Sequence, residues 1–227
     1  MHADELAALL DQTLLRPTAG LAEGREWIDL NAEEGFASLC ISPFLVPEAV
    51  RRLADTGTAV CSVVAFPLGY ATPAAKATEA EDLVGLGCRE IDMVVNVAAL
   101  LEGDDEFVRR DIAGVVFAVA EASEGAGLVK VILETGYLDA EQIGRGCALA
   151  VEGGAAFVKT STGFGPRGAS VEDVVLMREV VGRGIGIKAA GGIRTLEFAL
   201  ELIAAGATRI GTSAGRELLA AAAGQGH

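Results

Sequence analysis

Two lysines lie at the ends of short apolar segments, each directly before a run of small residues. Lys159 follows residues 155–158 and precedes Thr-Ser-Thr-Gly, and Lys188 follows residues 184–187 and precedes Ala-Ala-Gly-Gly. A buried ammonium group must find a partner or lose its proton, because a charge is unfavourable away from water. A desolvated amine is a nucleophile toward carbonyls. We therefore expect both lysines to face one pocket, with Lys159 as the nucleophile and Lys188 as a nearby positive charge that keeps it reactive.

Each lysine also has a less specific interpretation. Lys159 is compatible with a strand-end lysine whose stem is buried and whose ammonium group reaches solvent. Lys188 is compatible with a phosphate-binding lysine. The chain has only four lysines, at positions 76, 130, 159 and 188, and three of them lie in apolar, strand-like segments. Because lysine is usually a surface residue, this distribution favours a chemical role.

Charged residues also interrupt two other apolar segments. Asp92 lies within residues 90–97, and Lys130 and Glu134 share one strand face within residues 128–134. A buried carboxyl group needs a cationic or hydrogen-bonding partner, and Lys130 is a candidate. Asp92 and Lys130 could form a structural ion pair, or Asp92 could take part in the chemistry of the pocket. The two interpretations are compatible.

The elements that must position these residues alternate regularly along the chain. We predict strands at residues 11–14, 36–41, 58–66, 90–97, 128–134, 155–160, 186–189 and 208–212. We predict helices at residues 3–10, 17–34, 47–55, 72–87, 104–123, 139–152, 170–181 and 195–205, followed by an Ala-rich helix. Eight strand–helix units fit a single (β/α)8 TIM barrel with a short N-terminal helix, with an open doubly wound sheet as the alternative. Without a linker or composition break, residues 1–227 are expected to form one domain.

Small residues follow the last three predicted strands, where barrels of this type commonly bind phosphate. Glycine-rich segments alone are weak evidence, because glycine also ends helices. Their coincidence at these positions predicts a phosphate site at helix starts after strands seven and eight, closed by the loop after strand six. The candidate residues are Thr162, Gly163, Gly191, Gly192, Gly211 and Ser213.

The composition excludes several classes of partner and site. The net charge of −14 argues against nucleic acid, although a local pocket can still be positive. The longest uncharged segment, residues 56–75, contains two prolines and is not expected to span a membrane. Histidine occurs only at positions 2 and 227, which leaves none for a zinc site or a catalytic triad. We expect a soluble, cytoplasmic protein, because no secretory signal pattern is present.

Four sequence strings together resemble the deoxyribose-phosphate aldolase family. They are residues 157–165 (FVKTSTGFG), 188–194 (KAAGGIR), 130–135 (KVILET) and 66–69 (FPLG), and the similarity extends over about residues 10–215. The resemblance implies a class I aldolase, a lyase that reversibly splits 2-deoxy-D-ribose 5-phosphate into acetaldehyde and D-glyceraldehyde 3-phosphate during deoxyribose phosphate catabolism. It implies no metal or other cofactor, and we expect a homodimer or homotetramer.

The resemblance also implies roles for individual residues. Lys159 forms the Schiff base, Lys188 keeps that amine reactive and joins the proton network, and Asp92 moves protons through a bound water. The glycines at 191, 192 and 211 and Ser213 match positions that hold the phosphate. A different Schiff-base barrel, such as a transaldolase-like enzyme, and a non-catalytic phosphosugar-binding barrel are the alternatives.

Three features of the sequence bear on this resemblance. Gln12 stands where family members commonly have histidine, and residues 220–227 contain no tyrosine, which some longer members use in proton relay. Cys40 is expected near the mouth of the barrel as a site of inactivation by α,β-unsaturated aldehydes. The cysteines lack any Cys-x-x-Cys pair, and we expect buried thiols in a reducing compartment.

Overall fold

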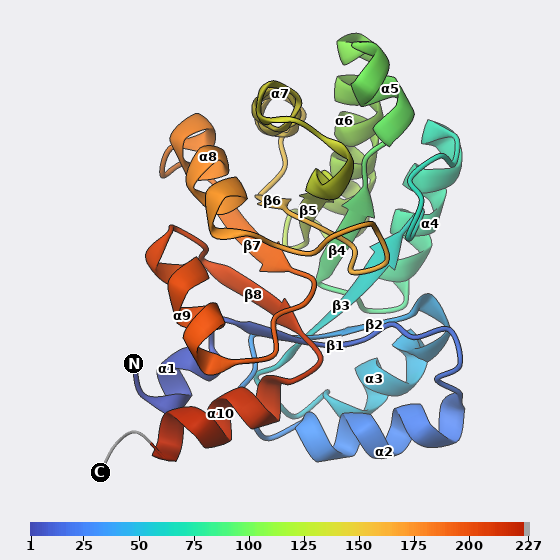
Figure 1. Cartoon of the computed structure of the whole chain (residues 1–227). Helices are drawn as coiled ribbons and strands as arrows, with labels where there is room; N and C mark the ends of the chain where they lie inside the picture. Colours follow the sequence, from blue (N-terminus) through green and yellow to red (C-terminus); the bar gives the residue numbers. More distant parts are fainter. Residues whose placement is uncertain (225–227) are drawn as a thin grey trace.

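Eight parallel strands form the centre of the computed structural model, which describes residues 1–224 (Figure 1). The strands are β1 (Leu10–Leu14), β2 (Ser38–Ile41), β3 (Ala59–Val64), β4 (Glu90–Val94), β5 (Leu128–Ile132), β6 (Phe157–Lys159), β7 (Gly186–Ala190) and β8 (Arg209–Thr212). They pair in chain order, and β8 closes the ring on β1. The predicted (β/α)8 barrel is therefore confirmed, and the open doubly wound sheet is excluded.

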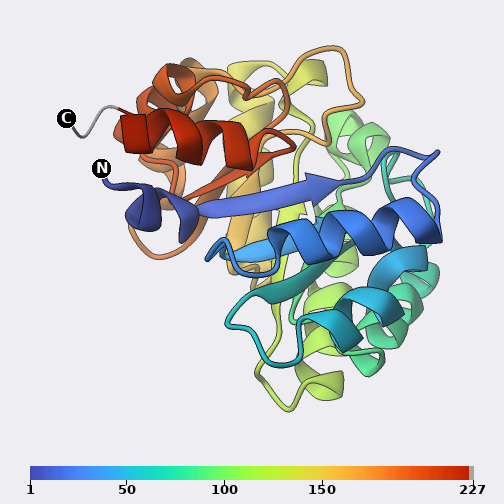
Figure 2. The ribbon, with the colours of Figure 1, turned by 90° about the horizontal axis from the view of Figure 1, so that it is seen from below.

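Helices surround the strands on the outside of the ring (Figure 1). They are α1 (Ala3–Ala7), α2 (Leu21–Asn31), α3 (Val46–Arg52), α4 (Pro73–Gly85), α5 (Val97–Glu102), α6 (Asp105–Ala122), α7 (Ala140–Glu152), α8 (Val171–Val181), α9 (Leu196–Ala204) and α10 (Gly215–Gly224), with 3-10 turns at Pro43–Leu45 and Thr135–Tyr137. Figures 1 and 2 show α1 beside α10. Within residues 1–224, no helix is both long and apolar enough to cross a bilayer.

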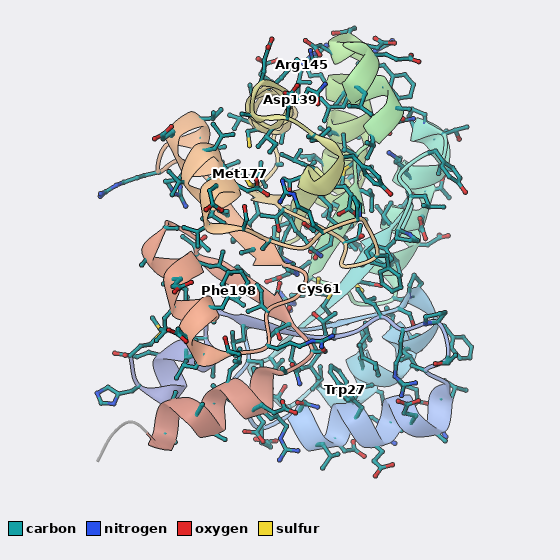
Figure 3. The ribbon with its side chains drawn as sticks, viewed as in Figure 1. Trp27, Cys61, Asp139, Arg145, Met177 and Phe198 are labelled. Atoms are coloured by element: carbon teal, nitrogen blue, oxygen red, sulfur yellow. The ribbon has the colours of Figure 1, made fainter. Side chains whose placement is uncertain are left out.

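The apolar core lies between the barrel and the ring of helices. Alternate strand residues point outward and are almost fully buried, because amphipathic helices cover them. These residues include Leu10, Leu39, Val60, Ile91, Val131, Val158, Ile187 and Ile210. Trp27, Met177 and Phe198 also lie among the outer helices, whereas Cys61 lies within the ring of strands (Figure 3).

The inside of the barrel is filled by side chains in layers of four, contributed by alternate strands, as is usual for this fold. Strand alternation and register place Ser38, Glu90, Phe157 and Arg209 in the lowest layer, then Asp11, Cys61, Lys130 and Lys188, then Cys40, Asp92, Lys159 and Gly211. Such layers usually hold branched apolar residues. Here they are mostly charged or polar, so the site chemistry occupies the interior itself.

Most of the predicted elements are present, with ends shifted by a few residues. The helix predicted at residues 17–34 spans only Leu21–Asn31, and the fourth strand, predicted to continue through residue 97, ends at Val94. Asn96 lies beyond the strand, and its side chain accepts a hydrogen bond from the N–H of Ala99. Asn96 thereby caps the start of α5, a helix that was not predicted. Gly103 ends α5 in a left-handed conformation with φ of 79°. The predicted tail, residues 220–227, belongs to α10 up to Gly224, and its last three residues lie outside the described part.

The start of α7 provides a test of local helix stability. The Asp139 carboxylate accepts the N–H of Gln142 at 2.9 Å, and the Gln142 side chain accepts the N–H of Asp139 at 2.9 Å. Asp139→Ala is expected to lower the free energy of unfolding by about 1 kcal/mol, because it leaves a helix N–H without its cap. Chemical denaturation measures this change.

Asp139→Asn is the matched control, since asparagine caps helices about as well as aspartate. It should restore most of the lost stability, and both variants should keep kcat. Equal destabilisation by alanine and asparagine would contradict the capping explanation.

Candidate active site

The carboxylate of Asp92 is the point at which the two strand-end lysines meet. Lys159 Nζ and Lys188 Nζ each lie 2.7 Å from the same oxygen, Asp92 Oδ2. Lys130 Nζ lies 2.8 Å from the other oxygen, Oδ1. The strand register explains this convergence, since Asp92 pairs with Lys130 across β4 and β5, and Lys159 pairs with Lys188 across β6 and β7. The structure thus brings the three expected residues together, and the Asp92–Lys130 ion pair exists beside them.

The buried cluster includes three charged residues that sequence reasoning missed. Asp11 Oδ2 lies 2.6 Å from Lys188 Nζ and 3.5 Å from Lys130 Nζ. Glu90 Oε2 lies 2.6 Å from Lys130 Nζ. Arg209 Nη1 lies 2.6 Å from Asp11 Oδ1 and 3.1 Å from Glu90 Oε2. Each of these three residues lies inside a predicted strand, which was the available signal. Closure of β8 on β1 brings Arg209 beside Asp11.

The charges of the cluster determine the protonation states of Asp92 and Lys188. Burial alone would raise the pKa of Asp92, but the three lysines around it hold that pKa well below its ordinary value. Burial alone would lower the pKa of Lys188, but the two aspartates that contact it raise that pKa instead. At neutral pH, Asp92 is therefore a carboxylate and Lys188 an ammonium group.

The number of charges in the cluster is uneven. It contains three acids and four bases, Asp11, Glu90, Asp92, Lys130, Lys159, Lys188 and Arg209. Lys159 contacts one carboxylate, which it shares, whereas each of the other bases contacts at least two. A buried charge without a partner is strongly unfavourable. Lys159 is therefore the base of the cluster with the fewest carboxylate contacts.

A cavity of about 200 Å³ opens above Lys159. It is lined by Lys159 and by all of the predicted phosphate-binding residues, Thr162, Gly163, Gly191, Gly192, Gly211 and Ser213. Sequence reasoning did not assign Arg194, whose exposed guanidinium group also lines the cavity and supplies a positive charge. The cavity therefore combines a strand-end amine with backbone and cationic groups suited to an anion.

The structure gives three of the predicted glycines a position other than a helix start. Gly191 and Gly192 were expected at a helix start, but α9 begins at Leu196 and is capped by Thr195, so they form a separate turn with φ of 95° and 78°. Gly211 lies inside β8 and not after it. A Cβ atom on Gly211 would lie 2.9 Å from Lys188 Cε, so this glycine leaves room for the lysine side chain.

Similarity to known proteins identifies the family of this chain. The sequence matches the family described as DeoC/LacD family aldolase over residues 6–221. The chain belongs to this aldolase family. The sequence-based resemblance is thereby confirmed, and the chain is an aldolase, a carbon–carbon lyase.

Several relatives of this aldolase cover nearly its whole length. The deoxyribose-phosphate aldolase of Enterococcus faecalis is 48% identical over 98% of this chain and 100% of its own. That of Caldanaerobacter subterraneus subsp. tengcongensis is 50% identical over 94% of this chain and 92% of its own. The structure of a tetrameric deoxyribose phosphate aldolase from Aeropyrum pernix matches with a TM-score of 0.88 at 31% identity, covering 96% of this chain and 91% of that one.

The structure defines the surroundings of Gln12 and Cys40, two residues that the sequence singled out. Gln12 points away from the barrel interior, where it accepts the N–H of Gly215 at 3.0 Å and donates to Asn31 at 3.1 Å. It therefore fixes the start of α10. Cys40 was expected near the mouth, but it is fully buried beside Cys61, and hydrogen bonding with Cys61 lowers the pKa of the Cys40 thiol. All four cysteines are free and buried, as expected.

Within residues 1–224, one group of three side chains has the spacing of metal ligands, Cys40, Cys61 and Asp92. The surroundings of this group do not suit a cation. Asp92 already contacts three lysine Nζ atoms, and Lys130 Nζ lies 3.3 Å from Cys61 Sγ. A metal ion would be repelled by these lysines.

The space beside Gly211 can be tested by filling it. Gly211→Ala is expected to displace Lys188 from Asp92 and to lower kcat of the aldolase by roughly tenfold to a hundredfold, because small misplacements of catalytic groups cost that much. Gly114→Ala on α6 is the matched control, since nothing lies within 4 Å of a Cβ atom there. Unchanged kcat in Gly211→Ala would show that the position of Lys188 does not matter.

The charge at the cavity edge can be tested separately. Arg194→Ala is expected to raise KM for a phosphorylated substrate by roughly tenfold, the effect of losing about 1.4 kcal/mol of binding, with little change in kcat. Steady-state kinetics measure both constants. Arg183→Ala, at the opposite end of the barrel beside Gly184 and Thr208, is the control. An equal change in KM for the unphosphorylated sugar would contradict a role for Arg194 in binding phosphate.

Proposed function

We propose that this aldolase reversibly cleaves 2-deoxy-D-ribose 5-phosphate into acetaldehyde and D-glyceraldehyde 3-phosphate through a Schiff base on Lys159. The observation that carries the proposal is the shared carboxylate oxygen, Asp92 Oδ2, which lies 2.7 Å from the amines of both Lys159 and Lys188. This contact sets a nucleophile beside a fixed positive charge and a proton acceptor. Relatives named deoxyribose-phosphate aldolase support the choice of substrate.

The reaction begins with the amine of Lys159, the base of the cluster that lines the cavity. Lys159 Nζ attacks the aldehyde carbon of the open-chain sugar, and loss of water gives an iminium ion. The iminium accepts the electron pair as the bond between C2 and C3 breaks, which releases D-glyceraldehyde 3-phosphate and leaves an enamine. Protonation at C2 and hydrolysis then release acetaldehyde and restore the amine. Covalent catalysis thus divides one difficult cleavage into easier steps.

Asp92 and Lys188 manage protons and charge around the reacting nitrogen. Asp92 is ionised, so it can accept a proton through a bound water and return it to the enamine. Lys188 stays charged, because Asp11 and Asp92 raise its pKa, and it supplies a fixed positive charge beside the reacting nitrogen. An amine activates the carbonyl through the iminium, so this scheme needs no metal or other cofactor.

The cavity supports the proposed orientation of the substrate. The aldehyde end would meet Lys159, and the phosphate would lie against Gly163, Gly191, Gly192 and Ser213, with Arg194 at the edge. Thr162 and Gly211 also line this cavity. A glycine-lined cradle lets backbone N–H groups approach phosphate oxygens closely.

We further infer that the chain acts as one barrel domain in the cytoplasm and forms a homodimer or homotetramer. Exposed apolar side chains on the outer helices, including Leu101 and Phe117, support self-association. The relative from Aeropyrum pernix is described as tetrameric. Four free, buried thiols are typical of a reducing compartment.

The decisive experiment traps the proposed intermediate. Sodium borohydride with acetaldehyde or the sugar phosphate should reduce a covalent adduct onto the peptide that contains Lys159, as shown by mass mapping. Lys159→Met, which keeps the side-chain volume, should lose the adduct and lower activity by at least about a thousandfold. Lys188→Leu should lose most activity and trap only slowly.

Donor use separates this proposal from its alternatives. Acetaldehyde as donor in the synthetic direction supports it, whereas transfer from a dihydroxyacetone donor would favour a transaldolase-like enzyme. An adduct that persists in Lys159→Met would reject Lys159 as the nucleophile, and sugar binding without any adduct would indicate a non-catalytic barrel.

A further inference from the structure

The carboxyl group of Glu134 is buried at the mouth of the barrel, and the proposed chemistry does not use it. Glu134 follows β5 and is 2% exposed. The N–H of Thr162 lies 3.3 Å from each Glu134 carboxylate oxygen, and the Thr162 hydroxyl donates to one of them. Both polar hydrogens of Thr162 therefore point at Glu134, although sequence reasoning assigned Thr162 to phosphate.

The contact continues along the loop after β6. Thr162 Oγ1 accepts the N–H of Phe164 at 3.0 Å, so the hydroxyl connects Glu134 to the next turn of the loop. A Cβ atom on Gly165 would lie 2.7 Å from Glu134 Cδ, so the loop closes tightly over the carboxyl group. Residues 162–165 thus wrap around one buried side chain.

Glu134 has an unfavourable backbone conformation that the surrounding contacts hold in place. Glu134 has φ of 57° and ψ of 60°, the left-handed region, which is unfavourable for a residue other than glycine. Such conformations persist where the surrounding structure fixes them, and they concentrate at functional sites. Here the N–H of Thr135 donates to Thr160 at 2.9 Å, which ties the turn to the start of the same loop.

The loop lies between two cavities. On one side, Gly163 lines the 200 Å³ cavity of the proposed phosphate cradle. On the other side, Phe164 lines a cavity of about 70 Å³ with Leu68 and Tyr137, and its ring meets that of Phe66 edge-on at 5.4 Å. A shift of this loop would therefore move Gly163 away from the cradle.

We propose that Glu134 is a positioning residue, which clamps residues 162–165 through Thr162 and so holds Gly163 in the phosphate cradle. This inference rests on the proposed function, because it assumes a phosphorylated substrate. It predicts a loss of affinity for the phosphate end and an intact Schiff base on Lys159.

The clamp is strongest with an ionised carboxylate, since Thr162 presents two donors and both carboxylate oxygens can accept. Burial raises the pKa of Glu134, although the bonds from Thr162 and the nearby Lys159 lower it in part. The other charged groups beside this turn are Arg167, which donates to the carbonyl of Thr135, and its partner Asp173. As pH falls through the raised pKa, Glu134 gains a proton and the clamp weakens, so KM should rise.

The test compares Glu134→Ala and Glu134→Gln with the unaltered enzyme. Glu134→Ala should raise KM for 2-deoxy-D-ribose 5-phosphate about tenfold while kcat changes less than about threefold. KM for unphosphorylated 2-deoxyribose and borohydride trapping of acetaldehyde should stay the same. Glu134→Gln keeps one acceptor oxygen and should restore part of the affinity, with a KM that no longer rises as pH falls. Glu121→Gln, at an exposed position on α6, is the control.

Thr162→Val should reproduce the increase in KM and guards against misfolding of Glu134→Ala, which its melting temperature would reveal. The proposal is overturned if both Glu134 variants and Thr162→Val keep the original KM, or if kcat and trapping fall in step with affinity. Failure of the proposed function looks different, because the unaltered enzyme itself would then show neither cleavage nor a trapped adduct.

Discussion

The charged interior of this barrel depends on a single carboxylate, Asp92, because the side chains of three lysines on other strands contact it. Ammonium groups so close together would repel one another strongly without an anion between them. Each charge buried in the barrel must therefore have a partner of opposite charge, since a buried charge without one is far more costly than a well-packed apolar side chain. The inside of the barrel is therefore a polar network of paired charges.

The rest of the fold accommodates this network. Apolar contacts between the strands and the outer helices form a large core that does not pass through the barrel interior. Arg209 and Glu90 close the lower end with further charge pairing, and Gly211 leaves the volume that the Lys188 side chain occupies. The upper end remains open at Lys159 and is lined by glycine turns. The basic groups deeper in the barrel each contact at least two carboxylates. Lys159, the amine that substrate can reach, contacts one.

Sequence reasoning located the strands and three central residues because their signals are local. Apolar segments, repeated eight times with glycine-ended helices between them, indicate this fold. The predicted end of the fourth strand was wrong because two local preferences compete there. Residues 95–97 continue an apolar strand pattern, yet Asn96 caps a new helix, and capping wins because the barrel no longer supplies a partner strand at that level. Thr162 lines the cavity beside Lys159, and its polar hydrogens are directed at Glu134, a contact between residues distant in sequence that no local signal shows.

The sequence by itself determined the barrel, the family resemblance and the residue types available for Schiff-base chemistry, since periodicity, scarce lysines and glycine-rich turns are all readable along one dimension. Only the tertiary structure decided which charges share a partner. Asp11 and Arg209 are separated by nearly the whole chain and meet because β8 closes on β1. Electrostatic compensation depends on distances of a few ångströms in a medium without water, and those distances exist only once the ring of strands is closed.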